Sequence, residues 1–345
     1  MDTNEPLNVV KSSSSQEKLI STEMGKLWAT YMGNTMSRCV LQYYLQHVED
    51  KDIKKIVEDA LNICESFIQT IKKIFKEENF PIPVGFNDTD VNLDAPRLFE
   101  DEFYLHYLRY TGKAGLSLYS AGTPLVIRSD IRDFFTNCIT TTVTLLNEVD
   151  RVMLAKGELT KPPQIPVPDK VDFVNKQSYV KGFFGDVRPL HALEITHLYD
   201  NIDNDVTSKC LLIGFSQVAK DEDVRKFMVR GKEITNKHIK KCSQILNKDN
   251  LSAIPLLDPL VSNSTVPPFS DKLMMFHKID MFSMKIRAYA NAISLNGRPD
   301  IGSIFAKFII DIGLYVEDGA SIMIDRGWME RPPEAADRDE LSSPK

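Results

Sequence analysis

An internal repeat constrains the fold of this 345-residue chain more than any other feature. When the sequence is aligned with itself at an offset of 171 residues, identical residues recur in both copies, among them Glu23 and Glu194, Leu27 and Leu198, Cys39 and Cys210, Asp50 and Asp221, and Ile68 and Ile239. After a one-residue length change the match continues at an offset of 170, as in Tyr119 and Tyr289 or Gly157 and Gly327. Self-similarity at a fixed period indicates a repeated structural unit. We therefore expect two copies of one domain, over residues 19–163 and 190–333.

Each copy has the hydrophobic pattern of four long helices. Apolar residues over 53–75 recur at spacings of three and four, the stripe of an amphipathic helix with one buried face. The same periodicity places helices at about 22–47, 99–121 and 129–156, and no segment alternates like a strand. The first and third links are short, whereas the middle link, about 80–98, is proline-rich and long enough to run the length of a helix. The sequence thus predicts an all-α fold of two tandem ferritin-like four-helix bundles related by an internal repeat.

A proline-rich connector, residues 164–189, joins the two copies. The prolines at 162, 163, 166 and 168 forbid helix and favour a semi-rigid extended spacer. The following piece is apolar and contains Phe173, Val174, Tyr179, Phe183 and Phe184. We expect it to pack on a bundle surface and to fix the two copies relative to each other. The polar tails, 1–18 and 334–345, should be disordered.

Composition argues against several partners and locations. The 42 Lys and Arg against 48 Asp and Glu give a net charge of -6, so the field of the molecule repels phosphate backbones and nucleic acid is not an expected partner. The first residues are acidic, and no apolar stretch approaches the roughly 18 residues that span a bilayer. We therefore expect a cytoplasmic protein that is not integral to a membrane. The five cysteines are odd in number and lie among apolar residues, which predicts buried free thiols.

Two stretches of the chain resemble a known family. They are LWATYMGNTMSRC at 27–39 and FVNKQSYVKGFFGDVRPL at 173–190, the latter followed by EITHLY at 194–199. Both resemble an uncharacterised family from spore-forming bacteria of the Bacillus group, which has tandem ferritin-like four-helix domains and is described as similar to spore coat protein F. The resemblance covers about 19–333. It implies the fold and a location in the forespore or spore, but it brings no activity and no catalytic residues.

The second copy contains candidate metal ligands. Ferritin-like di-iron sites take one Glu from each of two helices and a Glu-x-x-His pair from each of the other two. The second copy offers Glu194, His197, His238, His277, Asp280, Asp311 and Asp318, which would hold iron, manganese or zinc if they met. Without a metal, these residues have ordinary structural roles: Glu194 caps a helix, His238 is a core histidine, and Asp311 pairs with a histidine. The first copy has Phe67 and Tyr107 where the second has histidine, so it offers no such site.

Three functions remain open at this point. Neither copy contains a complete catalytic constellation, so we expect a non-enzymatic structural or interaction protein without a cofactor, connected with sporulation or the spore coat by resemblance. The first alternative is a metal-binding oxidoreductase or storage protein with its site in the second copy. The second alternative is a carrier of an apolar small molecule, whose pocket the aromatic residues of 99–110 would line. The sequence names no protein partner, oligomeric state or stage of the life cycle.

Overall fold

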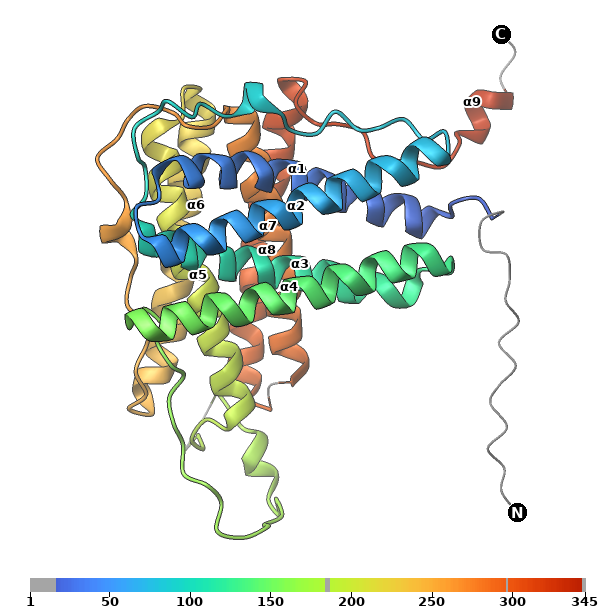
Figure 1. Ribbon diagram of the computed structural model, residues 1–345. Helices are drawn as coiled ribbons and strands as arrows, with labels where there is room; N and C mark the ends of the chain where they lie inside the picture. The colour runs from blue at the N-terminus through green and yellow to red at the C-terminus, as the bar shows by residue number, and fades with distance from the viewer. Residues whose placement is uncertain (1–16, 184–186, 296, 343–345) are drawn as a thin grey trace, which may run out of the picture.

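Two four-helix bundles make up the protein (Figure 1). The computed structural model describes residues 17–183, 187–295 and 297–342. The first bundle consists of α1 (Ser21–His47), α2 (Lys51–Glu77), α3 (Asp101–Gly122) and α4 (Ser129–Lys156), and the second consists of α5 (Ala192–Val218), α6 (Glu222–Lys248), α7 (Asp271–Leu295) and α8 (Pro299–Asp325). Short 3-10 turns lie at Asp88–Asp90, Thr123–Leu125, Gln177–Val180 and Asp258–Leu260. Within these described ranges no segment is a strand, and the all-α fold predicted from the repeat is confirmed.

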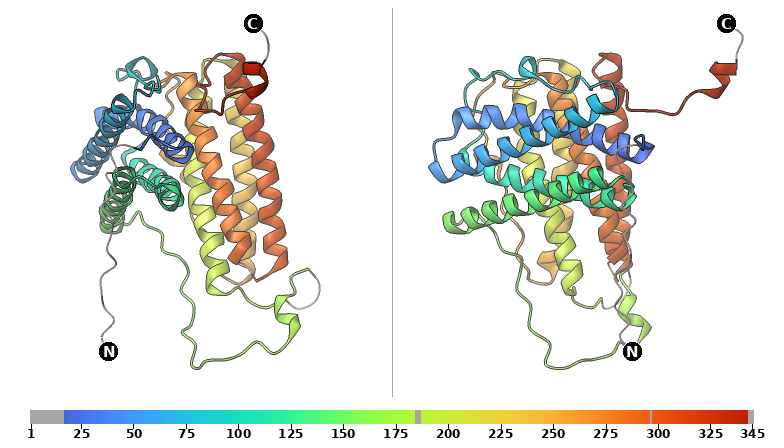
Figure 2. Two further views of the ribbon diagram at one scale, coloured as in Figure 1. Left: turned by 90° about the vertical axis from the view of Figure 1, so that its right-hand side faces the viewer. Right: turned by 45° about the vertical axis from the view of Figure 1, so that its right-hand side comes forward.

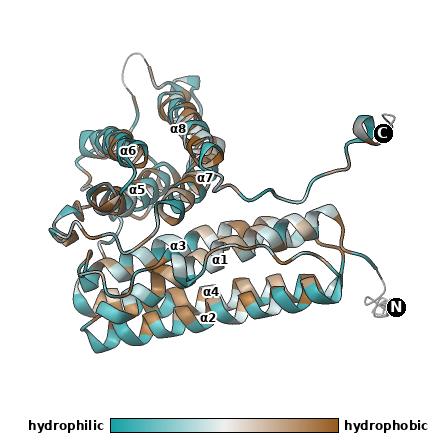
Figure 3. Cartoon of the chain, turned by 90° about the horizontal axis from the view of Figure 1, so that it is seen from above, coloured by the Kyte–Doolittle hydropathy of each residue, from teal (hydrophilic) through white to brown (hydrophobic). Residues whose placement is uncertain are grey.

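Equivalent residues of the two repeats determine where the helices begin and end. Asp50 accepts hydrogen bonds from the backbone N–H groups of Asp52 and Ile53 at the start of α2, and Asp221 does the same at the start of α6. These side chains satisfy donors that the first turn of a helix leaves free. At the end of α4, Gly157 adopts a left-handed conformation with φ of 76°. The outward faces of α2 and α6 carry mainly hydrophilic residues (Figure 3).

The two long crossovers, between α2 and α3 and between α6 and α7, pair with each other. Val91 forms an antiparallel bridge with Phe269, and Phe99 forms one with Val261. Equivalent residues here are 170 positions apart, so Val91 is equivalent to Val261 and Phe99 to Phe269. The repeat therefore relates each bridge to the other. The flanking hydrogen bonds are reciprocal as well: the Glu100 N–H donates to the Leu260 carbonyl and the Ser270 N–H donates to the Asp90 carbonyl. Such reciprocal contacts are the signature of an isologous, two-fold interface, here formed within one chain.

The bundles cross and touch through α1, α3, α5 and α7 (Figures 1 and 2). On one side of the crossing, Arg109 and Lys113 of α3 form ion pairs with Asp203 of α5. On the side related by the repeat, the residue equivalent to Asp203 is Met32, and the equivalent of Arg109 is Ile279. The contact between the two bundles is therefore symmetric in its backbone but not in the charges of its side chains.

The connector does not pack as the sequence suggested. It leaves the first bundle as an extended loop (Figure 2) and returns to the second bundle only near its end, where Gly182 lies against Asp300 and Arg188 binds Glu194. Its apolar side chains face solvent: Phe173 is 82% exposed, Val174 62% and Phe183 59%. Phe184 lies outside the described residues. The expectation that this piece fixes the two copies was wrong, because the crossovers and α3 and α7 supply that fixation instead. An apolar composition indicates that a segment packs against another surface, but it does not indicate that this surface belongs to the same chain.

Three smaller expectations have mixed outcomes. The C-terminal tail contains a short helix, α9 (Arg338–Ser342), where disorder over 334–345 was predicted; the N-terminal tail lies outside the described residues up to residue 16. All five cysteines are free thiols as expected, although Cys64 is only half-buried. In the part of the chain that the structure describes, no helix combines the length and apolar character needed to cross a bilayer.

Candidate functional site

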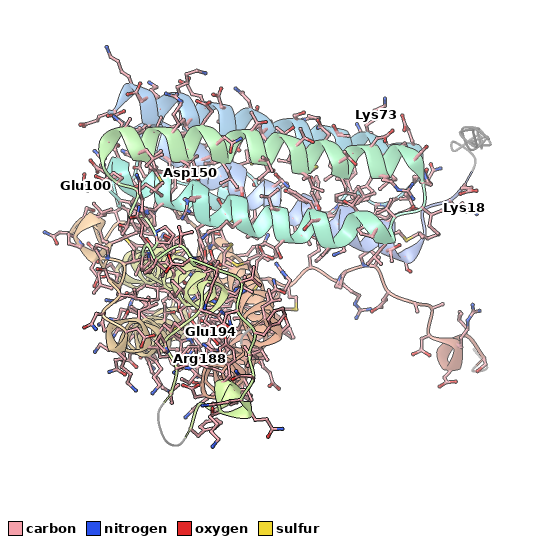
Figure 4. The ribbon with its side chains drawn as sticks, turned by 90° about the horizontal axis from the view of Figure 1, so that it is seen from below. Lys18, Lys73, Glu100, Asp150, Arg188 and Glu194 are labelled. Atoms are coloured by element: carbon pink, nitrogen blue, oxygen red, sulfur yellow. The ribbon has the colours of Figure 1, made fainter. Side chains whose placement is uncertain are left out.

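Glu194 closes the N-terminal corner of the second bundle. Its carboxylate accepts hydrogen bonds from the His191 and Arg298 backbone N–H groups and from the Arg188 guanidinium, the last at 2.8 Å (Figure 4). In the first repeat Glu23 binds the backbone N–H groups of Ile20 and Arg128 in the same way. Burial acts to raise the pKa of Glu194, but the hydrogen bonds from Arg188 and His191 outweigh it and hold that pKa below its ordinary value. This carboxylate caps a helix and ties α5 to α8.

Three other candidates have surroundings of their own. His197 is half-exposed on α5, and its carbonyl accepts a hydrogen bond from the Asn201 side chain. Asp318 lies on the outer face of α8 and pairs with Arg230 at 2.7 Å. Asp280 lines a cavity of about 110 Å³ at the contact between α7 and the first bundle. Burial raises the pKa of Asp280, opposed by the charge of Arg287.

His238 and Asp311 are the two candidates that approach each other. The His238 ring is fully buried on α6, stacks on Phe308 with ring centroids 3.7 Å apart, and places Nδ1 3.0 Å from the Tyr289 hydroxyl. Its Nε2 lies 3.7 Å from a carboxylate oxygen of Asp311, which also pairs with Lys237. Burial, followed by the nearby charge of Lys285, lowers the pKa of His238 to about 3. The imidazole is therefore neutral at neutral pH.

His277 points away from these residues, into the junction of the bundles. Its Nε2 lies 3.1 Å from the Tyr107 hydroxyl of α3, and burial lowers its pKa to about 3. The seven sequence candidates thus do not converge. Across residues 17–183, 187–295 and 297–342, no group of three or more His, Cys, Asp or Glu side chains is placed to hold a metal ion.

The structure reveals a buried ionic network that the sequence reasoning missed. At its centre Asp205 of α5 and Lys285 of α7 form an ion pair of 2.6 Å, with both side chains at most 2% exposed. The Tyr289 hydroxyl donates to Asp205 at 3.3 Å and links the pair to His238. Lys285 also donates to the Thr235 hydroxyl of α6 at 3.3 Å. One continuous network therefore joins α5, α6 and α7.

A second buried lysine stands beside this network, and no carboxylate of the described residues pairs with it. Lys278, one residue after His277 on α7, is fully buried and donates to the Ser208 hydroxyl at 2.8 Å. Its ammonium nitrogen lies 5.0 Å from the centre of the Phe282 ring. Burial, together with the like charge of Lys285, lowers the pKa of Lys278 well below its usual range. Burial likewise lowers the pKa of Lys285 and raises that of Asp205, each opposed by the partner's charge.

The first bundle lacks this network at the equivalent positions. Asn34 stands in place of Asp205, Gly115 in place of Lys285, and Leu108 in place of Lys278. A cavity of about 80 Å³, lined in part by Asn34, Gly115 and Tyr119, lies where the second bundle has the ion pair. It and the 110 Å³ cavity are below the roughly 300–1,000 Å³ of ordinary ligand pockets. The signal for the network was available in the sequence, since Lys278 and Lys285 are seven residues apart on the Met-rich, apolar stripe of one helix.

Comparison with solved structures finds a short, distant likeness. A protein from Bacillus halodurans C-125 named a "putative spore coat protein" aligns over 44% of this chain and 98% of its own, with a TM-score of 0.40 and 16% sequence identity. No curated protein matches. The sequence of the whole chain is more informative. The family described as "Protein of unknown function (DUF3231)" matches twice, at residues 8–171 and 178–341, with one match on each bundle, and the chain therefore belongs to this family as a tandem repeat.

Proposed function

We propose that this protein is a non-enzymatic structural protein whose two bundles form one rigid frame and whose connector binds a second copy of the same chain. The observation that carries the proposal is the exposure of the connector. Phe173, Val174 and Phe183 face solvent in one segment, and neighbouring Val167 and Val171 are 86% and 85% exposed. Contiguous exposed apolar side chains are typical of protein interaction sites.

Charge favours a second copy as the partner. Residues 161–188 contain five basic and three acidic side chains, whereas the whole chain has a net charge of -6. A basic, apolar segment on an acidic frame is attracted to the frame of another copy. The frame can receive it without rearrangement, because its bundles are already held together by the paired crossovers. The expected product is a chain of copies or a closed ring, according to the geometry of the contact.

Sedimentation velocity over a range of protein concentrations tests this proposal. The natural protein is expected to self-associate with rising concentration, and more weakly at high salt. A variant carrying Phe173→Ser, Val174→Ser and Phe183→Ser is expected to stay monomeric, and because these side chains are exposed the fold should survive.

A matched control removes three exposed apolar side chains elsewhere, by Ile127→Ser, Ile310→Ser and Leu314→Ser, which are 65%, 63% and 61% exposed. This control should associate like the natural protein. A natural protein that stays monomeric at every concentration, or a control variant that loses association equally, would overturn the proposal.

We further propose that the assembly belongs to the sporulating cell. The support is the resemblance of residues 27–39 and 173–190 to the spore coat protein F-like family. A fluorescent fusion expressed through sporulation should concentrate at the forespore or the spore surface. Uniform fluorescence of the mother cell at every stage would contradict this location.

A further inference from the structure

The outer face of the second bundle contains a basic groove between α6 and α8. Its volume is about 480 Å³, within the range of ordinary ligand sites. Lys237, Lys240 and Lys241 of α6 line one side and Lys307 of α8 the other. We call these four lysines and the space between them the α6–α8 groove.

Three of the four lysines have no acidic partner. Lys237 pairs with Asp311 at 3.3 Å, but Lys240, Lys241 and Lys307 have no carboxylate within 4 Å among the described residues. Glu233 is the acidic residue among those that line the groove. An unneutralised cluster of positive charge in an acidic protein produces a local field that attracts anions.

The floor of the groove is apolar and firmly supported. Ile304 and Phe308 of α8 line the groove together with the lysines; Ile304 is partly exposed, whereas Phe308 is 3% exposed and presents only an edge. Phe308 stacks on the buried His238 ring, which the network around Asp205 and Tyr289 holds in place. The floor therefore offers a fixed apolar surface to a ligand whose charged groups reach the lysines.

The basic character is specific to the second bundle. The first repeat has Gln69, Thr70 and Asn137 where the second has Lys240, Lys241 and Lys307. The same helix faces are present in both bundles, so the fold does not require these charges. Their presence in one copy is a difference in surface chemistry between two otherwise equivalent sites.

We propose that the α6–α8 groove binds an organic anion that has a flat apolar body and at least two negative charges. The charges would contact Lys240, Lys241 and Lys307, and the body would lie over Ile304 and Phe308. Such an anion can be a free aromatic dicarboxylate or an aromatic phosphate monoester. This inference does not depend on the connector, which contributes no residue to the lining of the groove.

Isothermal titration calorimetry with naphthalene-1,5-disulfonate, a rigid aromatic dianion, tests the proposal. The natural protein should bind one equivalent, more tightly than it binds naphthalene-1-sulfonate or inorganic phosphate, because both charges and the apolar body contribute. The variant Lys240→Gln, Lys241→Thr and Lys307→Asn copies the first repeat and should bind about tenfold more weakly, since three exposed ionic contacts are lost. All three lysines are exposed, so folding is preserved.

A control variant with the same change of charge separates the groove from the general field. Lys51→Gln, Lys54→Gln and Lys76→Gln alter exposed lysines of the first bundle and should leave the affinity within twofold of the natural value. Equal weakening in both variants, or phosphate binding as tightly as the aromatic dianion, would overturn the proposal.

Discussion

Tyr107 and His277 occupy equivalent positions in the two repeats, and they hydrogen-bond to each other at 3.1 Å. Ser117 and Arg287 are also equivalent, and the Arg287 guanidinium donates to the Ser117 hydroxyl at 3.0 Å. A residue meets its own equivalent only at a two-fold axis. The axis therefore runs between α3 and α7, and the chain has the architecture of a homodimer whose subunits have been joined and then allowed to diverge.

The contact on this axis predicts a pattern of coupled stabilities. Tyr107→Phe leaves the buried His277 Nε2 without a partner and should reduce the free energy of unfolding by about 1–3 kcal/mol. The double variant Tyr107→Phe, His277→Phe removes both polar groups and should be less destabilised than the sum of the single variants. Urea unfolding measures all three. Simple additivity would show that the two side chains do not interact.

The buried ion pair predicts an asymmetric response to substitution. Asp205→Asn leaves the Lys285 ammonium buried without a counter-charge and should cost about 3–5 kcal/mol. The double variant Asp205→Asn, Lys285→Met removes both charges and should recover a large part of that loss. Chemical denaturation of the three proteins decides the matter, and a double variant no more stable than Asp205→Asn would contradict the ionic account.

The buried histidines predict a loss of stability in acid. The pKa values of His238 and His277 are lowered to about 3, so the unfolded chain, whose histidines titrate near 6.5, binds more protons than the folded chain between these values. Their stabilising contribution is complete above about pH 6.5 and is lost as the pH falls, by about 2 kcal/mol per histidine at pH 5. His238→Phe, which copies Phe67 of the first repeat, should show a shallower decline between pH 7 and 5. Identical slopes for the variant and the natural protein would refute this.

The scattered positions of the seven candidate ligands predict that metal is not needed for stability. Protein purified without chelator should contain no stoichiometric iron, manganese or zinc by mass spectrometry, and chelator should leave its melting temperature unchanged. Stoichiometric metal that disappears in His238→Phe would restore the metal-binding alternative for the second bundle.

The sequence predicted the helices well because their signal is local. The periodic pattern over 129–156 coincides with α4 as observed, and the first and third links are short in both bundles, as the sequence predicted. The pairing of the crossovers escaped prediction, since Val91 and Phe99 each meet a residue far away along the chain through single bridges. A single bridge of this kind produces no alternation of apolar and polar residues in the sequence.

The site was harder to predict than the fold. His238 was correctly expected among core residues, but Lys278 and Lys285 on the same buried side of α7 were not considered, because lysine is seldom buried and nothing local announces its partner. Asp205 is that partner, and it lies about 80 positions earlier on α5. The prediction that the connector packs on a bundle was wrong for the opposite reason. Phe173 and Val174 are apolar, but whether an apolar side chain is buried depends on which other parts of the protein lie beside it.

Cutting the connector tests the central claim most directly, namely that the bundles are held by their own two-fold contacts. A specific protease site inserted after Lys170, in the exposed loop, allows cleavage of the folded protein. Size-exclusion chromatography without denaturant should then show both fragments eluting together at the volume of the uncut protein, because the paired crossovers and the Tyr107–His277 contact remain. Separation into two half-size species would show that the connector, and not the two-fold interface, holds the molecule together.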